Sequence, residues 1–260
     1  MTAIEVPKEG LTNLNVIKQK AIRLLGVPLQ QTSIPFIVSH PFASSVMFFV
    51  KRREVEELVA EIPDLEIPES EECNTPELIF NIFEYPNLWR AILKKQILKQ
   101  NELARLIFLI NKPYQLFFFS LIKNDISSQE LGTLLGTFWQ SVENISTDCN
   151  VASEELIRLF QKSDKSSIMN KNEFKKYCSL PDEVILWRGV TDYNIKNEKA
   201  LSWTDNKDTA LWFANRFPSE NSELWEIKIP KEQVLACFDY ENEYIVDMCS
   251  CDIFIKKETL

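Results

Sequence analysis

The sequence predicts an α+β protein, with a mainly helical N-terminal region packed on a C-terminal region built around an antiparallel or mixed β-sheet. Three observations lead to this prediction. Apolar residues recur at helical spacing between residues 77 and 178, and short runs of β-forming residues follow Pro181. Most links between those runs are too short to hold a crossover helix, which favours antiparallel pairing.

The first predicted segment, residues 1–76, is the hardest to interpret and has no assigned role. Residues 36–50 mix β-forming residues with prolines and fit either strands or a buried loop, whereas residues 51–60 predict one short charged helix. Residues 61–76 are acidic and include Pro63, Pro68 and Pro76, a composition typical of a linker. We therefore predict a domain boundary after residue 76.

The second predicted segment, residues 77–180, is helical. Its most hydrophobic stretch, residues 103–122, is interrupted by Asn111, Lys112 and Pro113, so its pieces are too short to span a bilayer. The predicted helix starts are a capping box of Ser127 with Glu130, an N-cap at Ser153, and a second capping box of Asn170 with Glu173. We interpret the aromatic residues of this segment as core packing.

The third predicted segment, residues 181–260, is rich in β-strands. A single helix is expected within it, at residues 205–217. The predicted strands are residues 184–190, 200–204, 224–229, 234–238, 243–246 and 253–255.

Composition argues against several classes of function. The formal net charge of −9 disfavours nucleic acid and anionic membrane surfaces as partners. With 5 glycines the chain carries no glycine-rich phosphate loop, and with a single histidine, His40, we expect no metal site. The six cysteines form no CxxC pair, although Cys249 and Cys251 would share a face of a strand; we expect the reduced thiols of a cytoplasmic protein. The first ten residues show no signal-peptide pattern.

Three short patterns in the last segment carry candidate chemistry. Arg188, followed by Gly189, ends an apolar strand, and its planar fork suits either a structural carboxylate or a phosphate ligand. Gly189 would let backbone or ligand approach closely. Ser202 and Thr204 would present two hydroxyl groups on one face of a strand, with Trp203 on the other face.

The third pattern is a pair of acidic residues at the entry of a late strand. Glu241 and Glu243 are two positions apart, so their carboxylates would point the same way, and one pKa should rise unless a cation or ligand compensates. A solvated acidic turn is the alternative interpretation.

Taken in order, these patterns resemble the Arg-Ser-Glu class of mono-ADP-ribosyltransferases. The segments LPDEVILWRGV, ALSWTDNKDTALWFANRF and ENEYIVD look like those of phage- and prophage-associated proteins with such a C-terminal domain. The helical stretches ISSQELGTLLGTFWQSVEN and VASEELIRLF also resemble that group, so the similarity covers roughly residues 120–250. The histidine-dependent class of the same fold is disfavoured, because His40 lies far upstream in an unrelated segment.

The resemblance implies an activity and a set of roles. The protein would cleave NAD, its substrate, and transfer ADP-ribose to a protein, at arginine by analogy with the class. Arg188 would hold the NAD phosphates and ribose, Ser202 would orient Glu243, and Thr204 would support the strand. Glu243 would be the catalytic residue and Glu241 would activate the acceptor. Trp203 or Phe213 would either line the nicotinamide pocket or pack in the core.

Two departures from the family pattern place the acceptor in doubt. Trp203 stands where many members carry a small hydroxyl residue, and Arg188 lies only 14 positions before Ser202, so the usual long excursion between the two strands is missing. In the family, elements of that excursion would line one side of the NAD site, and the helical segment is the candidate to close that side here. Alternative functions are an NAD glycohydrolase and a non-enzymatic phage-related interaction protein; nucleic-acid binding is disfavoured by the charge.

Overall fold

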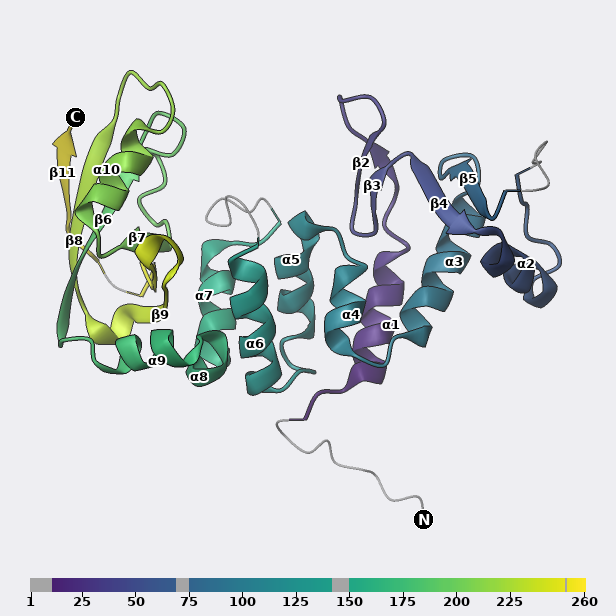
Figure 1. Cartoon of the computed structure of the whole chain (residues 1–260), viewed down its shortest axis with the longest axis horizontal. Helices are drawn as coiled ribbons and strands as arrows, with labels where there is room; N and C mark the ends of the chain where they lie inside the picture. Colours follow the sequence, from purple (N-terminus) through teal and green to yellow (C-terminus); the bar gives the residue numbers. More distant parts are fainter. Residues whose placement is uncertain (1–10, 69–74, 142–149, 251) are drawn as a thin grey trace, which may run out of the picture. The chain divides into compact units, whose positions relative to one another are not determined.

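The computed structural model describes residues 11–68, 75–141, 150–250 and 252–260 (Figure 1). These residues divide into two compact units. The N-terminal unit comprises residues 13–125, and the C-terminal unit comprises residues 126–260 together with Leu11 and Thr12. Each unit is described by itself below. Within the described ranges, no helix is long and apolar enough to cross a membrane.

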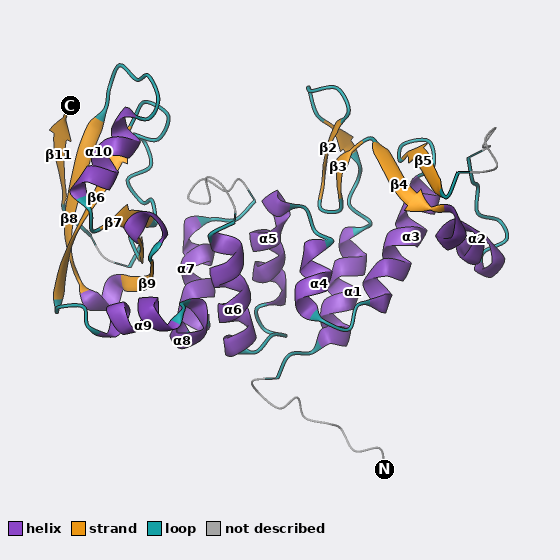
Figure 2. Cartoon of the chain, in the orientation of Figure 1, coloured by secondary structure: helices purple, strands orange, loops and turns teal. Residues whose placement is uncertain are grey.

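The N-terminal unit combines helices with two small antiparallel sheets (Figure 2). Residues 36–50, which fitted either strands or a buried loop, contain strands. Asn13 caps the first helix, and prolines start two later helices, Pro86 at α3 and Pro113 at α5, where their missing N–H costs nothing. The elements are α1 (Leu14–Leu24), β1 (Gln30–Gln31), β2 (Ile37–His40), β3 (Ala43–Ser45), β4 (Met47–Lys51), α2 (Arg52–Glu61), β5 (Glu77–Asn81), α3 (Pro86–Lys99), α4 (Leu103–Phe108) and α5 (Lys112–Ile122).

The predicted boundary after residue 76 is wrong, because a strand pair spans it. Strand β4 pairs with β5 in an antiparallel register that sets Val50 opposite Leu78 and Lys51 opposite Glu77. Helix α2 and the proline-containing stretch therefore form a long connection between two paired strands. Residues 69–74 of that stretch lie outside the described residues.

The C-terminal unit is α+β, as predicted, and contains a six-stranded antiparallel sheet ordered β11-β8-β6-β7-β10-β9 (Figure 2). Its helices are α6 (Ser128–Trp139), α7 (Ser153–Lys162), α8 (Lys165–Ile168), α9 (Lys171–Cys178) and α10 (Lys207–Asn215). Its strands are β6 (Glu183–Val190), β7 (Ser202–Thr204), β8 (Glu223–Pro230), β9 (Val234–Phe238), β10 (Glu243–Val246) and β11 (Ile255–Thr259).

The sheet consists of two halves that meet at one point. Strands β11, β8 and β6 form one half with continuous registers, and β7, β10 and β9 form the other. The halves share the single residue pair Trp187 and Thr204, whereas all 3 residues of β7 pair with β10. The pleat is therefore not continuous between β6 and β7, and side chains of the two halves can turn toward one another there.

Helix α9 is anchored to β9, so the end of the predicted helical segment lies in the same unit as the sheet. The Cys237 thiol donates to the carbonyl of Glu173 at 3.3 Å, and the Asp239 N–H donates to the Glu173 carboxylate at 3.0 Å. Helices α6–α9 thus belong to the same unit as the sheet, whereas the helices of residues 86–122 belong to the N-terminal unit. The predicted helical segment is divided between the two units.

The helix starts follow the sequence patterns with two differences. Asn170 and Glu173 form the predicted capping box. Ser127 caps α6, but the Glu130 carboxylate accepts from Thr12, whose hydroxyl oxygen in turn accepts the Ser127 N–H at 3.0 Å. The N-cap of α7 is Ala152 rather than Ser153, because the extended backbone ends one residue earlier.

Candidate functional site

Glu243 lies at the centre of the candidate site, at the start of β10. Its backbone pairs with Thr204 of β7 on one side and with Phe238 of β9 on the other, which fixes the position of its Cα. The indole Nε1 of Trp139 donates to Oε2 of the carboxylate at 3.2 Å, and the Ser202 hydroxyl is hydrogen-bonded to the same carboxylate. Residues from three distant parts of the chain thus meet at one carboxyl group.

The electrostatics of Glu243 are a balance of opposing effects. Burial raises the pKa of its carboxyl above the usual range, and the charge of Glu241 adds to that rise. The hydrogen bonds from Ser202 and Trp139 and the positive charge of Arg188 oppose it. These partners favour the ionised form, which is the form able to stabilise a developing cation.

Arg188 reaches the same site from β6. Its Nη1 donates to the carbonyl of Ser202, while its Nε is buried without a hydrogen-bond partner. Burial lowers the pKa of Arg188 to about 10, against the effect of the Glu243 charge, so the guanidinium is still charged at neutral pH. An unpaired buried donor on a charged group is costly, and an anionic or hydroxyl-bearing ligand would satisfy it.

Alternation along β6 would not by itself bring Arg188 to this site. Trp187 is the residue opposite Thr204, so a continuous pleat would turn Arg188 to the other face. The halves of the sheet separate after that single pair, and the long guanidinium side chain crosses to the Ser202 backbone. Arg188, Ser202 and Glu243, three of the residues named from the sequence, are therefore brought together.

Glu241 stands in a strained turn rather than on a strand. Residues Tyr240–Asn242 form a 3₁₀ turn in which Glu241 has φ 58° and Asn242 has φ 49°. Two consecutive non-glycine residues in the left-handed region are uncommon and cost about 1–3 kcal/mol each. The Thr204 hydroxyl holds the turn by donating to the Glu241 carbonyl at 3.2 Å. Thr204 supports the site in this way, and the Glu241 charge acts on Glu243.

Three other predicted site residues have structural explanations. Trp203 is 2% exposed, pairs with Tyr244 on the face away from Ser202, and donates to the carbonyl of Ala200 at 2.8 Å. A Cβ on Gly189 would lie 2.0 Å from the carbonyl oxygen of Ala210, so this glycine allows α10 to pack on β6 and admits no ligand. Phe213 is half-buried on α10 and packs edge-to-face on Trp212. These contacts favour the packing interpretation for all three residues.

Trp139 is the site residue that sequence reasoning missed. It ends the apolar stripe of α6 and is 3% exposed, so its spacing indicated only core packing. Its indole N–H offered the one available signal, because a buried tryptophan usually finds a hydrogen-bond partner for that group. The sequence pattern could not identify the partner, which lies 104 positions away.

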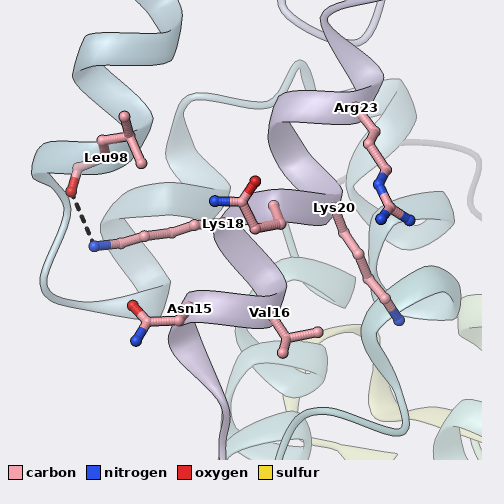
Figure 3. Close-up of a pocket in the computed structure, with 7 residues that line it drawn as sticks. Asn15, Val16, Lys18, Lys20, Arg23 and Leu98 are labelled. Atoms are coloured by element: carbon pink, nitrogen blue, oxygen red, sulfur yellow. Dashed lines mark hydrogen bonds between the residues drawn. The ribbon is translucent and has the colours of Figure 1, made fainter.

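The N-terminal unit contains a separate surface depression, lined along α1 by Asn15, Val16, Lys18, Gln19, Lys20 and Arg23, with Leu98 opposite (Figure 3). Two of its cations are already engaged: Lys18 donates to the Leu98 carbonyl at 2.9 Å, and Lys20 pairs with Asp125 at 2.5 Å. None of these lining residues carries a carboxylate. We therefore place the candidate chemistry at Glu243 rather than at this depression.

Searches for relatives and for metal ligands add no further assignment. The chain matches no protein-family model, no curated protein and no solved structure. Among the described residues, no group of three or more His, Cys, Asp or Glu side chains could hold a metal ion. The geometry at Glu243 is therefore the basis for assigning a function.

Proposed function

We propose that the protein is a mono-ADP-ribosyltransferase that cleaves NAD and transfers ADP-ribose to a protein acceptor, at arginine. The observation that carries this proposal is that Arg188, Ser202 and Glu243 lie together although they come from three strands. Arg188 donates to the Ser202 carbonyl, the Ser202 hydroxyl is hydrogen-bonded to the Glu243 carboxylate, and the charges of Arg188 and Glu243 act on each other. The resemblance of the surrounding segments to the Arg-Ser-Glu class supports it. Among the described residues Cys178, Cys237 and Cys249 are free thiols, whereas Cys251, which was predicted to share a strand face with Cys249, lies outside the described residues.

The proposed cleavage needs a negative charge beside the sugar and no general acid. The bond between the nicotinamide nitrogen and C1′ of the ribose breaks, and its electron pair leaves with the nicotinamide, which becomes neutral. The ribose acquires oxocarbenium character, which the Glu243 carboxylate stabilises while accepting a hydrogen bond from an adjacent hydroxyl, as in glycoside hydrolysis. Arg188, whose Nε is unpaired, would bind the anionic part of NAD.

The proposed transfer needs a second carboxylate. A guanidinium nitrogen of the acceptor attacks C1′, forms the new C–N bond, and loses a proton to Glu241. A guanidinium has a pKa far above neutrality, so this step needs a group that orients it and takes its proton. Glu241 is suited to that role because its rigid turn holds its charge close to Glu243.

The experiment uses the purified full-length protein with NAD labelled in the adenylate part, with and without a bacterial lysate as the source of acceptors. Wild-type protein should label a lysate protein and release nicotinamide. Glu243→Gln should reduce both by roughly 10²–10³-fold, since it removes the charge that stabilises the transition state. Glu232→Gln, an exposed glutamate of the same unit, is the matched control and should behave as wild type.

The other outcomes separate the alternatives. Free ADP-ribose without labelled protein, across several lysates, would replace the transferase proposal with an NAD glycohydrolase. Failure to consume or bind NAD would refute both activities and favour a non-enzymatic interaction protein. Loss of activity in Glu232→Gln equal to that in Glu243→Gln would show that the assay reports on folding rather than on the site.

A further inference from the structure

The contact between Trp139 and Glu243 joins the helical part of the C-terminal unit to the candidate site. Trp139 is the last residue of α6, is 3% exposed, and packs edge-to-face against Phe160 of α7 with ring centroids 4.9 Å apart. The ring is therefore fixed before any ligand binds. Its only polar atom, Nε1, is directed at Oε2 of Glu243 at 3.2 Å.

The backbone around Trp139 is held as tightly as its ring. Gly132 and Gly136, on the preceding turns of α6, lie against the backbone of α8, where a Cβ would come within 2.8 Å of the Asp164 carbonyl oxygen and 2.0 Å of the Ile168 carbonyl oxygen. The next residue after α8, Met169, contacts Cys237 of β9 through its sulfur at 3.4 Å from the Cys237 nitrogen. Because β9 pairs with β10, this chain of contacts fixes α6 relative to Glu243.

We propose that Trp139 is a positioning residue for Glu243, and that its indole N–H holds the carboxylate in one orientation and favours the charged form for NAD cleavage. The catalytic consequence of this inference rests on the proposed function, whereas the contact between Trp139 and Glu243 is independent of it. The Trp139 N–H occupies one side of the carboxylate and the Ser202 hydroxyl also binds it, so a remaining lone pair can accept a hydrogen bond from the ribose. The helical segment would thus complete the site.

Removing the indole N–H should affect protonation of Glu243 more than binding of NAD. A hydrogen bond to a charged group favours the charged form, and here it acts against burial. Trp139→Phe keeps an aromatic ring beside Phe160 but has no donor. The acid limb of the pH profile of kcat should move up by about one pH unit, so that kcat falls by up to about tenfold at pH values on that limb, with KM nearly unchanged.

The matched control is Trp212→Phe. Trp212 is 54% exposed on α10, where it packs edge-to-face on Phe213, so this variant makes the same replacement away from Glu243. The control should retain the wild-type position of the acid limb. A purely structural role for Trp139 would lower the amount of active protein without moving the acid limb, and that result would overturn the proposal.

A second measurement is independent of NAD and of the stability of any variant at position 139. The chain has 6 tryptophans, so a ¹⁵N spectrum should resolve six indole N–H signals, and Trp139→Phe identifies the one from Trp139. In wild-type protein this signal should shift with pH as Glu243 titrates, and in Glu243→Gln it should not. If Trp139→Phe does not fold, the signal is identified as the one whose pH response Glu243→Gln abolishes.

The two measurements separate failure of this inference from failure of the proposed function. If the indole signal titrates with Glu243 but the protein does not cleave NAD, the contact between Trp139 and Glu243 is supported. The catalytic role of that contact and the transferase proposal are then both refuted. An active protein in which no indole signal responds to Glu243, or in which Trp139→Phe retains the wild-type acid limb, would overturn the positioning role alone.

Discussion

Replacing Gly136 with alanine should destabilise the C-terminal unit although alanine is the better helix former. The new Cβ would lie 2.0 Å from the carbonyl oxygen of Ile168 and 3.0 Å from its carbonyl carbon. A carbon and an oxygen atom do not approach much closer than roughly 3.2 Å. Helices α6 and α8 would therefore have to separate by about 1 Å, and the obstacle is backbone that cannot rotate away.

The size of the effect follows from two opposing contributions to the free energy of unfolding. Overpacking a buried contact costs typically about 1–3 kcal/mol, and a clash with backbone belongs at the upper end. The higher helix propensity of alanine stabilises the helix by about 1 kcal/mol relative to glycine. The net loss is about 2 kcal/mol, which lowers the melting temperature of a unit of this size by roughly 6–10 °C.

Calorimetry of the full chain measures this loss. Thr137→Ala is the matched control, since Thr137 is the next residue on α6, is exposed, and gives up only a hydrogen bond to the Thr133 carbonyl. The control should melt at the wild-type temperature or slightly above it. A Gly136→Ala protein that melts no lower than wild type would show that α6 and α8 do not pack this closely, and would remove the basis for the fixed position of Trp139.

Three further predictions concern single residues. Glu241→Gln should abolish labelling of protein while sparing most nicotinamide release, because water attacks an oxocarbenium ion with less help than a guanidinium does; equal labelling by wild type and variant would identify Glu241 as a turn residue only. Arg188→Lys should raise KM for NAD about tenfold or more, since an ammonium lacks the planar fork; an unchanged KM would separate Arg188 from NAD. His40, which burial holds at a pKa of about 4, should titrate at that pH in a histidine NMR spectrum that contains one imidazole signal. The unfolded chain binds that proton first, so the N-terminal unit should lose up to about 3 kcal/mol as the pH falls from 6.5 toward 4, and a His40 signal titrating near 6.5 would contradict this.

Local patterns predicted most elements of the C-terminal unit and the neighbourhood of the site, but they missed α8 and placed the last strand at residues 253–255, whereas β11 is Ile255–Thr259. The capping box at Asn170 and the strand around Glu243 depend on residues a few positions apart, so the sequence carried their full signal. The expectation that Ser202 and Thr204 share a face also depended only on the period of a strand. The orientation of Glu241 could not be predicted in this way, because its left-handed backbone breaks that period.

The division into units could not be predicted from local composition. Prolines and acidic residues between 61 and 76 indicated a linker, but the pairing of Val50 with Leu78 depends on two strands separated by a helix and a long connection. The composition of a segment indicates how far it is exposed to water. It does not indicate which strands pair, because pairing depends on which apolar faces meet. The same limit applies to Gly189, where the sequence left backbone and ligand as alternatives and the packing of α10 decides for backbone.

The candidate site shows how neighbouring side chains can favour the charged form of a buried carboxylate, in a protein with one histidine and with no group of metal ligands among its described residues. Burial raises the pKa of the Glu243 carboxyl, and three neighbouring groups act against that rise. Each opposing group comes from a different element: Arg188 from β6, Ser202 from β7 and Trp139 from α6. None of these elements is adjacent in sequence to β10, so the three interactions that oppose the effect of burial on Glu243 form only when the whole unit is folded. A site assembled in this way cannot act in a partly unfolded chain, which ties the proposed activity to the stability of the contact between α6 and α8.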